Sequence, residues 1–158
     1  MPNTDFDFVH GSWAVRNRRR RDSLDPAATE WDEFDSTGIH VPLAGGMGNL
    51  ETYETADFPN IGAFTGLALR LHEPVTDVWR IYWSSSAAPG KLDSPLVGGF
   101  DGPRGTFLSH DVVRGTEVDV RFVWRNVDRV TATWEQAFST DGGDTWDTNW
   151  VMEMTRTS

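Results

Sequence analysis

Aromatic side chains, with a few polar ones among them, are the residues of this chain that could bind a small molecule. The 158 residues include 8 Trp and 9 Phe. Alternate side chains of a β-strand share a face, and this alternation places several tryptophans on faces that should point inward: Trp79, Trp83, Trp124, Trp134 and Trp150. Indole rings of this kind either fill a core or line a cavity for an apolar ligand. The sequence does not decide between a filled and an open interior, and both alternatives stay open.

Gln136 is a polar side chain in phase with these aromatic residues. It alternates with Trp134 and Phe138, so its amide should lie among aromatic rings and needs a hydrogen-bond partner. The residues that could supply one are Asn49, Tyr53 and Glu33. The amide is therefore either a satisfied core group or a contact to the ligand.

The basic run at residues 16–21 could bring an arginine to the same ligand. The default interpretation pairs its arginines, on a solvent-exposed face, with acidic residues of the next strand, which are Asp32, Glu33 and Asp35. In a second interpretation the inward face of Trp13 continues through Asn17 to Arg19 and Arg21. Because arginine binds carboxylates through paired hydrogen bonds, Arg19 could then hold the carboxylate of a ligand at one mouth of a barrel.

Acid–base and nucleophilic chemistry has weaker support. The spacing of the four histidines is not typical of a metal site, and they are His10, His40, His72 and His110. His110 and Asp111 are adjacent, so on a strand they point in opposite directions and make a poor general-base pair. An enzyme that cyclises or isomerises a hydrophobic metabolite would have to use Glu33, Tyr53 or His110 as acid or base. We expect no metal and no cofactor.

The composition excludes several classes of partner. A net charge of −10 and a pI of about 4.7 argue against nucleic acid and against an anionic membrane surface, both of which require a basic face. The chain has no Cys, which excludes disulfides and thiolate metal sites. It opens without a basic and apolar leader and has no apolar run of about 20 residues. We therefore expect a cytoplasmic protein that does not span a membrane.

The strongest local signal is a β-hairpin over residues 130–154, which would position most of these side chains. Its two alternating runs flank the sequence TDGGD at residues 140–144, and Asp-Gly and Gly-Gly supply the positive φ angles of a tight turn. The hairpin should place four large side chains on one face: Trp134, Phe138, Trp150 and Met152. Glu135 and Asn149 are out of phase with that face and should lie outside.

The remaining chain is typical of an all-β protein. Short alternating runs separated by turn residues predict strands at 13–21, 31–41, 49–55, 64–72, 78–84, 95–100, 105–109 and 117–125, before the two of the hairpin. Beyond a short helical turn near Phe6, no segment has a helical period. The prediction is one domain over residues 1–158, a single antiparallel up-and-down barrel of roughly ten strands, because closure removes exposed strand edges.

Three motifs resemble a known family. They are F-D-F-x-x-G-x-W at residues 6–13, G-L-A-L-R-L at 66–71 followed by W-R-I-Y-W at 79–83, and W-E-Q-A-F-S-x-D-G-G-x-T-W-x-x-N-W at 134–150. The chain is similar in these stretches to the DUF1579-type family of small bacterial proteins. The resemblance implies a calycin-like barrel, akin to lipocalins and fatty-acid-binding proteins, and it implies no catalytic residues.

Three hypotheses follow: a binding protein for a small hydrophobic or amphipathic molecule, an enzyme acting on such a molecule, and a structural or interaction barrel with a filled core. The first is favoured over the second because no acid–base pair can be assembled. Neither nucleic acid nor a membrane is an expected partner, and the protein should be a monomer or a homodimer. The candidate ligand-binding residues are Trp83, Trp124, Trp134, Gln136, Trp150, Arg19, Glu33 and Tyr53.

Overall fold

The computed structural model describes residues 2–158, which form ten strands and two short 3₁₀ turns. The turns are η1 (Asp7–Val9) and η2 (Ala44–Gly46). The strands are β1 (Gly11–Arg20), β2 (Trp31–Pro42), β3 (Gly48–Phe58), β4 (Gly62–Glu73), β5 (Val78–Ser85), β6 (Leu96–Asp101), β7 (Arg104–Val113), β8 (Thr116–Asn126), β9 (Thr131–Ser139) and β10 (Asp147–Arg156). Among the described residues, no helix is long and apolar enough to cross a lipid bilayer.

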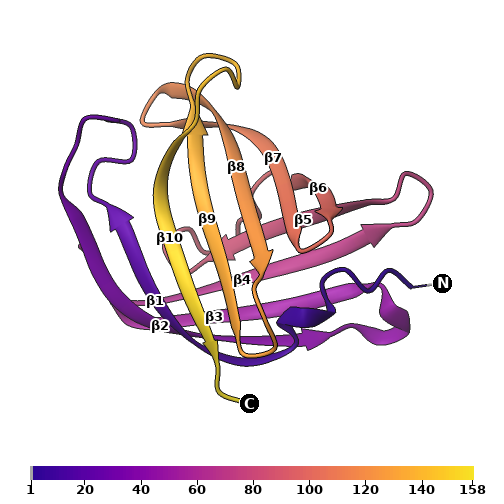
Figure 1. Cartoon of the computed structure of the whole chain (residues 1–158). Helices are drawn as coiled ribbons and strands as arrows, with labels where there is room; N and C mark the ends of the chain where they lie inside the picture. Colours follow the sequence, from indigo (N-terminus) through magenta and orange to yellow (C-terminus); the bar gives the residue numbers. More distant parts are fainter. Residues whose placement is uncertain (1) are drawn as a thin grey trace.

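The strands form a closed antiparallel barrel in which each strand pairs with its neighbours in the chain. Pairing of β1 with β10, from Trp13 opposite Arg156 to Arg19 opposite Trp150, completes the ring. In Figure 1 strands β7 to β10 run steeply across strands β2 to β5, so the two halves of the barrel face each other. The predicted all-β up-and-down barrel, with its short N-terminal helical turn, is confirmed.

The N-terminal turn η1 covers one end of the barrel. Phe6, immediately before it, is fully buried, and its ring lies 5.0 Å from that of Trp79 and 5.9 Å from that of Trp124. Val9 is also fully buried, and its carbonyl accepts a 2.7 Å hydrogen bond from Trp13 Nε1. This end of the barrel is therefore closed by apolar packing, and a ligand would have to enter elsewhere.

The β9–β10 hairpin has the predicted turn. Gly142 and Gly143 have φ angles of 73° and 93°, which β-carbon-bearing residues rarely adopt. Asp141 accepts a hydrogen bond of 2.9 Å from the backbone N–H of Thr145, and its contacts with the Thr145 side chain and backbone lower its pKa to about 2. The turn is thus fixed by backbone geometry and by one carboxylate.

Replacing Gly142 with Val should lower the free energy of unfolding by about 1–3 kcal/mol. A Cβ at this position would meet nothing within 4 Å, so the whole cost comes from the positive φ. Gly99→Val is the matched control, because a Cβ there also meets nothing and φ is not in the left-handed region. Urea unfolding followed by Trp fluorescence measures both, and an equal effect of the two substitutions would contradict the argument.

Strand β4 turns its small residues and an arginine inward. Gly66, Ala68 and Arg70 are buried, whereas Leu67 on the opposite face is 39% exposed. The reason at Gly66 is steric: a Cβ there would lie 2.2 Å from the indole of Trp83 on β5. The glycine leaves the space in which this tryptophan reaches the barrel interior.

The barrel wall is weakest between β5 and β6. These strands pair only from Trp79 opposite Gly98 to Ile81 opposite Leu96. Beyond Ile81, β5 stays paired with β4 as far as Ser85, and residues 86–95 then connect it to β6. Within this connection Asp93 N–H donates a 2.9 Å hydrogen bond to the Trp83 carbonyl. The segment before β6 therefore takes the place of a paired strand in this part of the wall.

Candidate functional site

The barrel interior contains a cavity of about 220 Å³. Four tryptophans from four strands line it, as the alternation predicted: Trp83, Trp124, Trp134 and Trp150. The rings of Trp134 and Trp150 are 5.3 Å apart and perpendicular, an edge-to-face contact that fixes both walls. The interior is open, so the alternative of a completely filled core does not hold for this barrel.

Arg19 lines the cavity from β1 and has no counter-charge. Its guanidinium carbon lies 5.3 Å from the ring centres of both Phe58 and Trp150. These two rings are 5.9 Å apart and inclined by 74°, so the group packs in the corner that they form. Within residues 2–158 no carboxylate oxygen lies within 4.0 Å of it, and its Nε is buried without a hydrogen-bond partner. Burial lowers the pKa of Arg19 from its ordinary value. The inward orientation that the second interpretation expected is therefore confirmed for Arg19. It is wrong for Arg21, which is exposed and pairs with Glu30 and Asp32.

The exposed neighbouring arginines follow the default interpretation. Arg16 and Arg18 point outward and pair with acidic residues of β2, Arg16 with Asp35 at 3.1 Å and Arg18 with Glu33 at 3.5 Å. Glu33, a predicted ligand-binding residue, therefore lies on the outer face and away from the cavity. The reason is the strand period: Glu33 stands opposite Arg18, which is out of phase with the inward Arg19.

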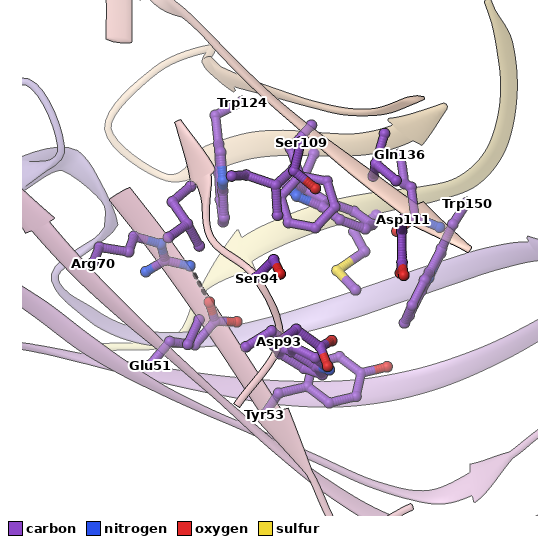
Figure 2. A pocket seen from close by; sticks show the side chains of 18 of the residues that line it. Glu51, Tyr53, Arg70, Asp93, Ser94, Ser109, Asp111, Trp124, Gln136 and Trp150 are labelled. Carbon is purple, nitrogen blue, oxygen red and sulfur yellow. Dashed lines mark hydrogen bonds and ion pairs between the residues drawn. The ribbon is translucent and has the colours of Figure 1, made fainter. Parts of the chain in front are cut away.

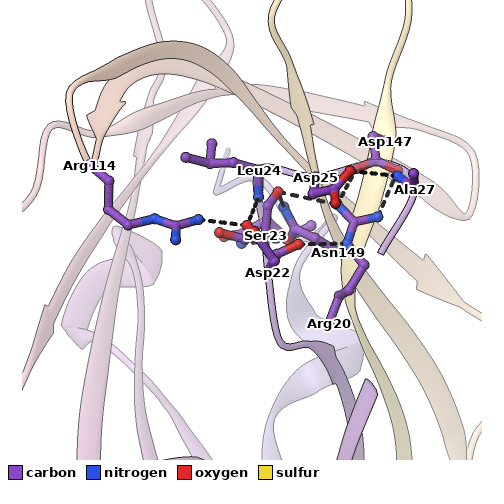
Figure 3. A network of polar contacts seen from close by, with 10 residues as sticks. Arg20, Asp22, Ser23, Leu24, Asp25, Ala27, Arg114, Asp147 and Asn149 are labelled. Carbon is purple, nitrogen blue, oxygen red and sulfur yellow. Dashed lines mark hydrogen bonds and ion pairs between the residues drawn. The ribbon is translucent and has the colours of Figure 1, made fainter. Parts of the chain in front are cut away.

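Arg20 and the segment after β1 close the barrel end next to Arg19. Arg20 is buried and forms a bidentate ion pair with Asp147 at the start of β10 (Figure 3). It also donates to the backbone carbonyls of Asp22, at 2.8 Å, and Ser23, at 3.2 Å. Arg114 in the β7–β8 turn donates a 2.7 Å hydrogen bond to Asp22 Oδ1. The loop is thus tied to two distant parts of the barrel rim.

Gln136 lines the cavity and has an unexpected partner. Its Nε2 donates a 2.9 Å hydrogen bond to Asn149 Oδ1, and the three partners suggested by the sequence do not take part. Asn149 is 1% exposed, so the expectation that it lies outside is wrong. A β-bulge between Thr148 and Trp150 explains the difference, because the register shift turns Asn149 inward together with Trp150.

Tyr53 contributes a polar group on the opposite wall. Its hydroxyl and the indole Nε1 of Trp150 both donate to Asn17 Oδ1, each at 3.1 Å. Asn17 is fully buried and donates in turn to Ser36 Oγ at 2.8 Å. Burial raises the pKa of Tyr53 to about 12. The hydroxyl is therefore a weak acid that holds the Trp150 ring in place through Asn17.

A buried charged cluster at the closed end was not predicted. Arg70 on β4 forms an ion pair with Glu51 on β3, and both residues line the cavity (Figure 2). Arg70 also donates to Asn49 Oδ1 at 2.8 Å and lies 3.1 Å from His40 Nδ1. Burial raises the pKa of Glu51, but His40 and Arg70 outweigh it, so the net shift is downward. Burial lowers the pKa of His40 to about 4. The histidine is therefore neutral and the carboxylate ionised near neutral pH.

Two further carboxylates and two serines line the cavity. Asp93 and Ser94 come from the segment between β5 and β6, and Ser109 and Asp111 come from β7. Burial raises the pKa of Asp93, with a second contribution from the charge of Asp111. The sequence contained no signal for Asp93 and Ser94, because a loop has no side-chain period. Ser109 and Asp111 lie on a strand, but their place in the interior was not predicted from the sequence.

The candidates for acid–base chemistry are dispersed. His110 is exposed on the outer face of β7 and lies 3.0 Å from Asp119, and Glu33 also lies outside. Of the three, only Tyr53 faces the cavity. Among residues 2–158, no group of three or more His, Asp and Glu side chains is placed to hold a metal ion.

Comparisons with known proteins add one structural likeness. No family model matches the chain. No curated protein matches it either. Among solved structures it is similar to the S-type phycobiliprotein lyase CPES from Guillardia theta, with 12% sequence identity and a TM-score of 0.41, over 97% of this chain and 90% of that chain. These comparisons assign no family to the chain.

Proposed function

We propose that this protein binds a small amphipathic molecule whose apolar body lies between the tryptophans and whose anionic group, such as a carboxylate, pairs with Arg19. The observation that carries the proposal is the unpaired cation in the cavity wall. The buried arginines Arg20 and Arg70 each have a carboxylate partner, whereas Arg19 has none within residues 2–158. A ligand carboxylate would supply it.

The two aromatic rings around Arg19 favour this role. They contact the guanidinium from two directions and limit its movement, so less side-chain entropy is lost when its N–H groups bind an anion. Although burial lowers its pKa, arginine stays protonated in proteins. Its buried Nε–H lacks a partner, and a carboxylate accepts two parallel hydrogen bonds from such a group.

The apolar walls supply the rest of the affinity. Burial of apolar ligand surface yields roughly 25 cal/mol per Å², before the cost of association is subtracted. Gln136 is held by Asn149 and Trp150 by Asn17, so both wall residues are oriented before a ligand binds. A pre-formed cavity of this kind is typical of small-molecule sites.

The alternative of a cyclase or isomerase has less support. A general acid or base near neutral pH needs a pKa near the working pH. The pKa of Tyr53 is about 12 and that of Glu51 is lowered, so neither of these two residues meets this condition. Asp93, whose pKa burial raises, is the remaining candidate in the cavity. Binding of a small molecule requires no proton transfer, and the cavity is consistent with that function.

The family, the cellular location and the classes of partner are part of the same proposal. Membership of the DUF1579-type family is supported by the three motifs described above, and no family model adds to them. A cytoplasmic location is supported by the absence of Cys and by the net charge of −10. The acidic surface also supports a role without nucleic acid or a membrane as partner.

Replacing Arg19 with Gln tests the proposal. Calorimetric titration with a naphthoic acid should show binding to the wild type and about 10- to 100-fold weaker binding to Arg19→Gln, since a hydrogen bond to a charged group is lost. The corresponding neutral naphthamide should bind both proteins equally. Arg18→Gln, on the outer face, is the matched control. Equal binding of the acid to wild type and Arg19→Gln would refute the role of Arg19.

A further inference from the structure

The ion pair at the closed end of the cavity leaves one carboxylate oxygen free. Glu51 Oε2 accepts from Arg70, whereas Oε1 has no hydrogen bond within residues 2–158. The Glu51 side chain keeps 10% of its surface accessible, and it lines the cavity. An ionised carboxylate is a strong acceptor with no donor of its own. A donor group of a ligand could therefore reach it.

His40 places an N–H beside this free oxygen. Arginine only donates hydrogen bonds, so His40 Nδ1, 3.1 Å from Arg70 Nη1, must accept and the ring proton must be on Nε2. His40 Nε2 is buried without a partner and lies 3.8 Å from Glu51 Oε1. This distance is too long for a direct hydrogen bond. Glu51 lines the cavity and His40 does not, so a ligand oxygen at Oε1 would accept from Nε2–H as well after a small shift of the His40 ring.

The cluster lies at the other end of the cavity from Arg19. Arg70 stacks on Phe6 and Trp124, with its guanidinium 5.1 and 5.0 Å from the ring centres, at the end closed by the N-terminal turn. Arg19 instead stacks on Trp150, beside the loop that closes the opposite end. Figure 2 shows Arg70 and Glu51 on one side of the cavity and Trp150 on the other.

We infer that Glu51 and His40 recognise a hydroxyl group of the ligand, at the end remote from its acid group. This inference rests on the proposed function and narrows the ligand class to hydroxy acids with an apolar, aromatic or alicyclic body. A hydroxyl donates and accepts at once, which matches one free carboxylate oxygen beside one free N–H. An ether oxygen cannot donate, and a methyl group can do neither.

The test compares a hydroxynaphthoic acid with its methyl ether by calorimetric titration of the wild-type protein. The hydroxy acid should bind about 10- to 100-fold more tightly, because the hydrogen bond is made to an ionised group. In Glu51→Gln the difference in affinity between the hydroxy acid and its methyl ether should fall to about 3-fold or less, since a neutral acceptor forms weaker hydrogen bonds. Glu33→Gln, the same change on the outer face, should retain the full difference.

Each other outcome overturns the inference. Equal binding of both acids to the wild type would mean that no ligand hydroxyl is recognised by Glu51 and His40, while the proposed function would stand. A preference that survives Glu51→Gln would assign the hydroxyl to another residue. If neither acid binds, the proposed function fails as well. The wild-type comparison needs no variant, so reduced folding of Glu51→Gln cannot obscure the result.

Discussion

Replacing Arg70 with Met should lower the free energy of unfolding by about 3–5 kcal/mol. The substitution removes the partner of Glu51, which would then be an uncompensated charge inside the barrel. Arg70 is 1% exposed and also donates to Asn49, so a second buried polar group would lose its hydrogen bond. Urea unfolding followed by Trp fluorescence measures the change.

Two comparison variants separate the charge effect from lost packing. Arg18→Met breaks an exposed pair with Glu33, and it should cost at most about 1 kcal/mol. The double variant Arg70→Met with Glu51→Leu removes both charges and should recover most of the stability, because replacing a whole buried pair by apolar side chains is often neutral. If the double variant is as unstable as Arg70→Met, the loss comes from packing rather than from the unpaired carboxylate.

The fold could be predicted because its two determinants are local. Strand alternation defines faces, and glycine-containing turns such as that at Gly142 and Gly143 define where the chain reverses. Ten such strands without a helical period leave few arrangements besides a closed meander. The same alternation predicted that Trp83, Trp124, Trp134 and Trp150 point inward, and these four tryptophans line one cavity.

The polar half of the site could not be predicted because it depends on non-local register. Alternation divides β4 into a leucine face and a face with Gly66, Ala68 and Arg70, but it does not say which face is inside. The answer depends on Trp83, which occupies the space over Gly66, and on Glu51, which neutralises Arg70 from another strand. The pairing between strands determines both contacts, and this pairing cannot be read from the sequence of a single strand.

Other residues of the site could not be predicted because they lie in irregular parts of the chain. The β-bulge after Thr148 reverses the phase of Asn149, so a strict period of two places that residue on the wrong face. Asp93 lines the cavity from the segment between β5 and β6, which has no secondary structure. Glu33 was misplaced for another reason: it is in a correctly predicted strand, but its outward phase pairs it with Arg16 and Arg18.

Replacing Trp134 with Ala should cost about 3 kcal/mol of stability, at the lower end of the 3–5 kcal/mol typical of buried aromatic residues. Trp134 is 6% exposed and contacts Phe122 and Trp150, with ring centres 4.9 and 5.3 Å apart. Part of its indole, however, faces a cavity that already exists, so fewer packing contacts are lost than in a filled core. Urea unfolding measures the cost.

The same variant should bind a naphthoic acid about 10-fold more weakly, the scale expected when an aromatic wall residue is truncated. Trp146→Ala makes the same chemical change outside the cavity, where the indole stacks on Arg121 at 4.7 Å. It should leave binding unchanged and cost about 1 kcal/mol or less. A cost well above 5 kcal/mol for Trp134→Ala, with binding unaffected, would mean that this tryptophan packs a closed core. Weaker binding with modest destabilisation would show that the indole is a wall of the ligand site.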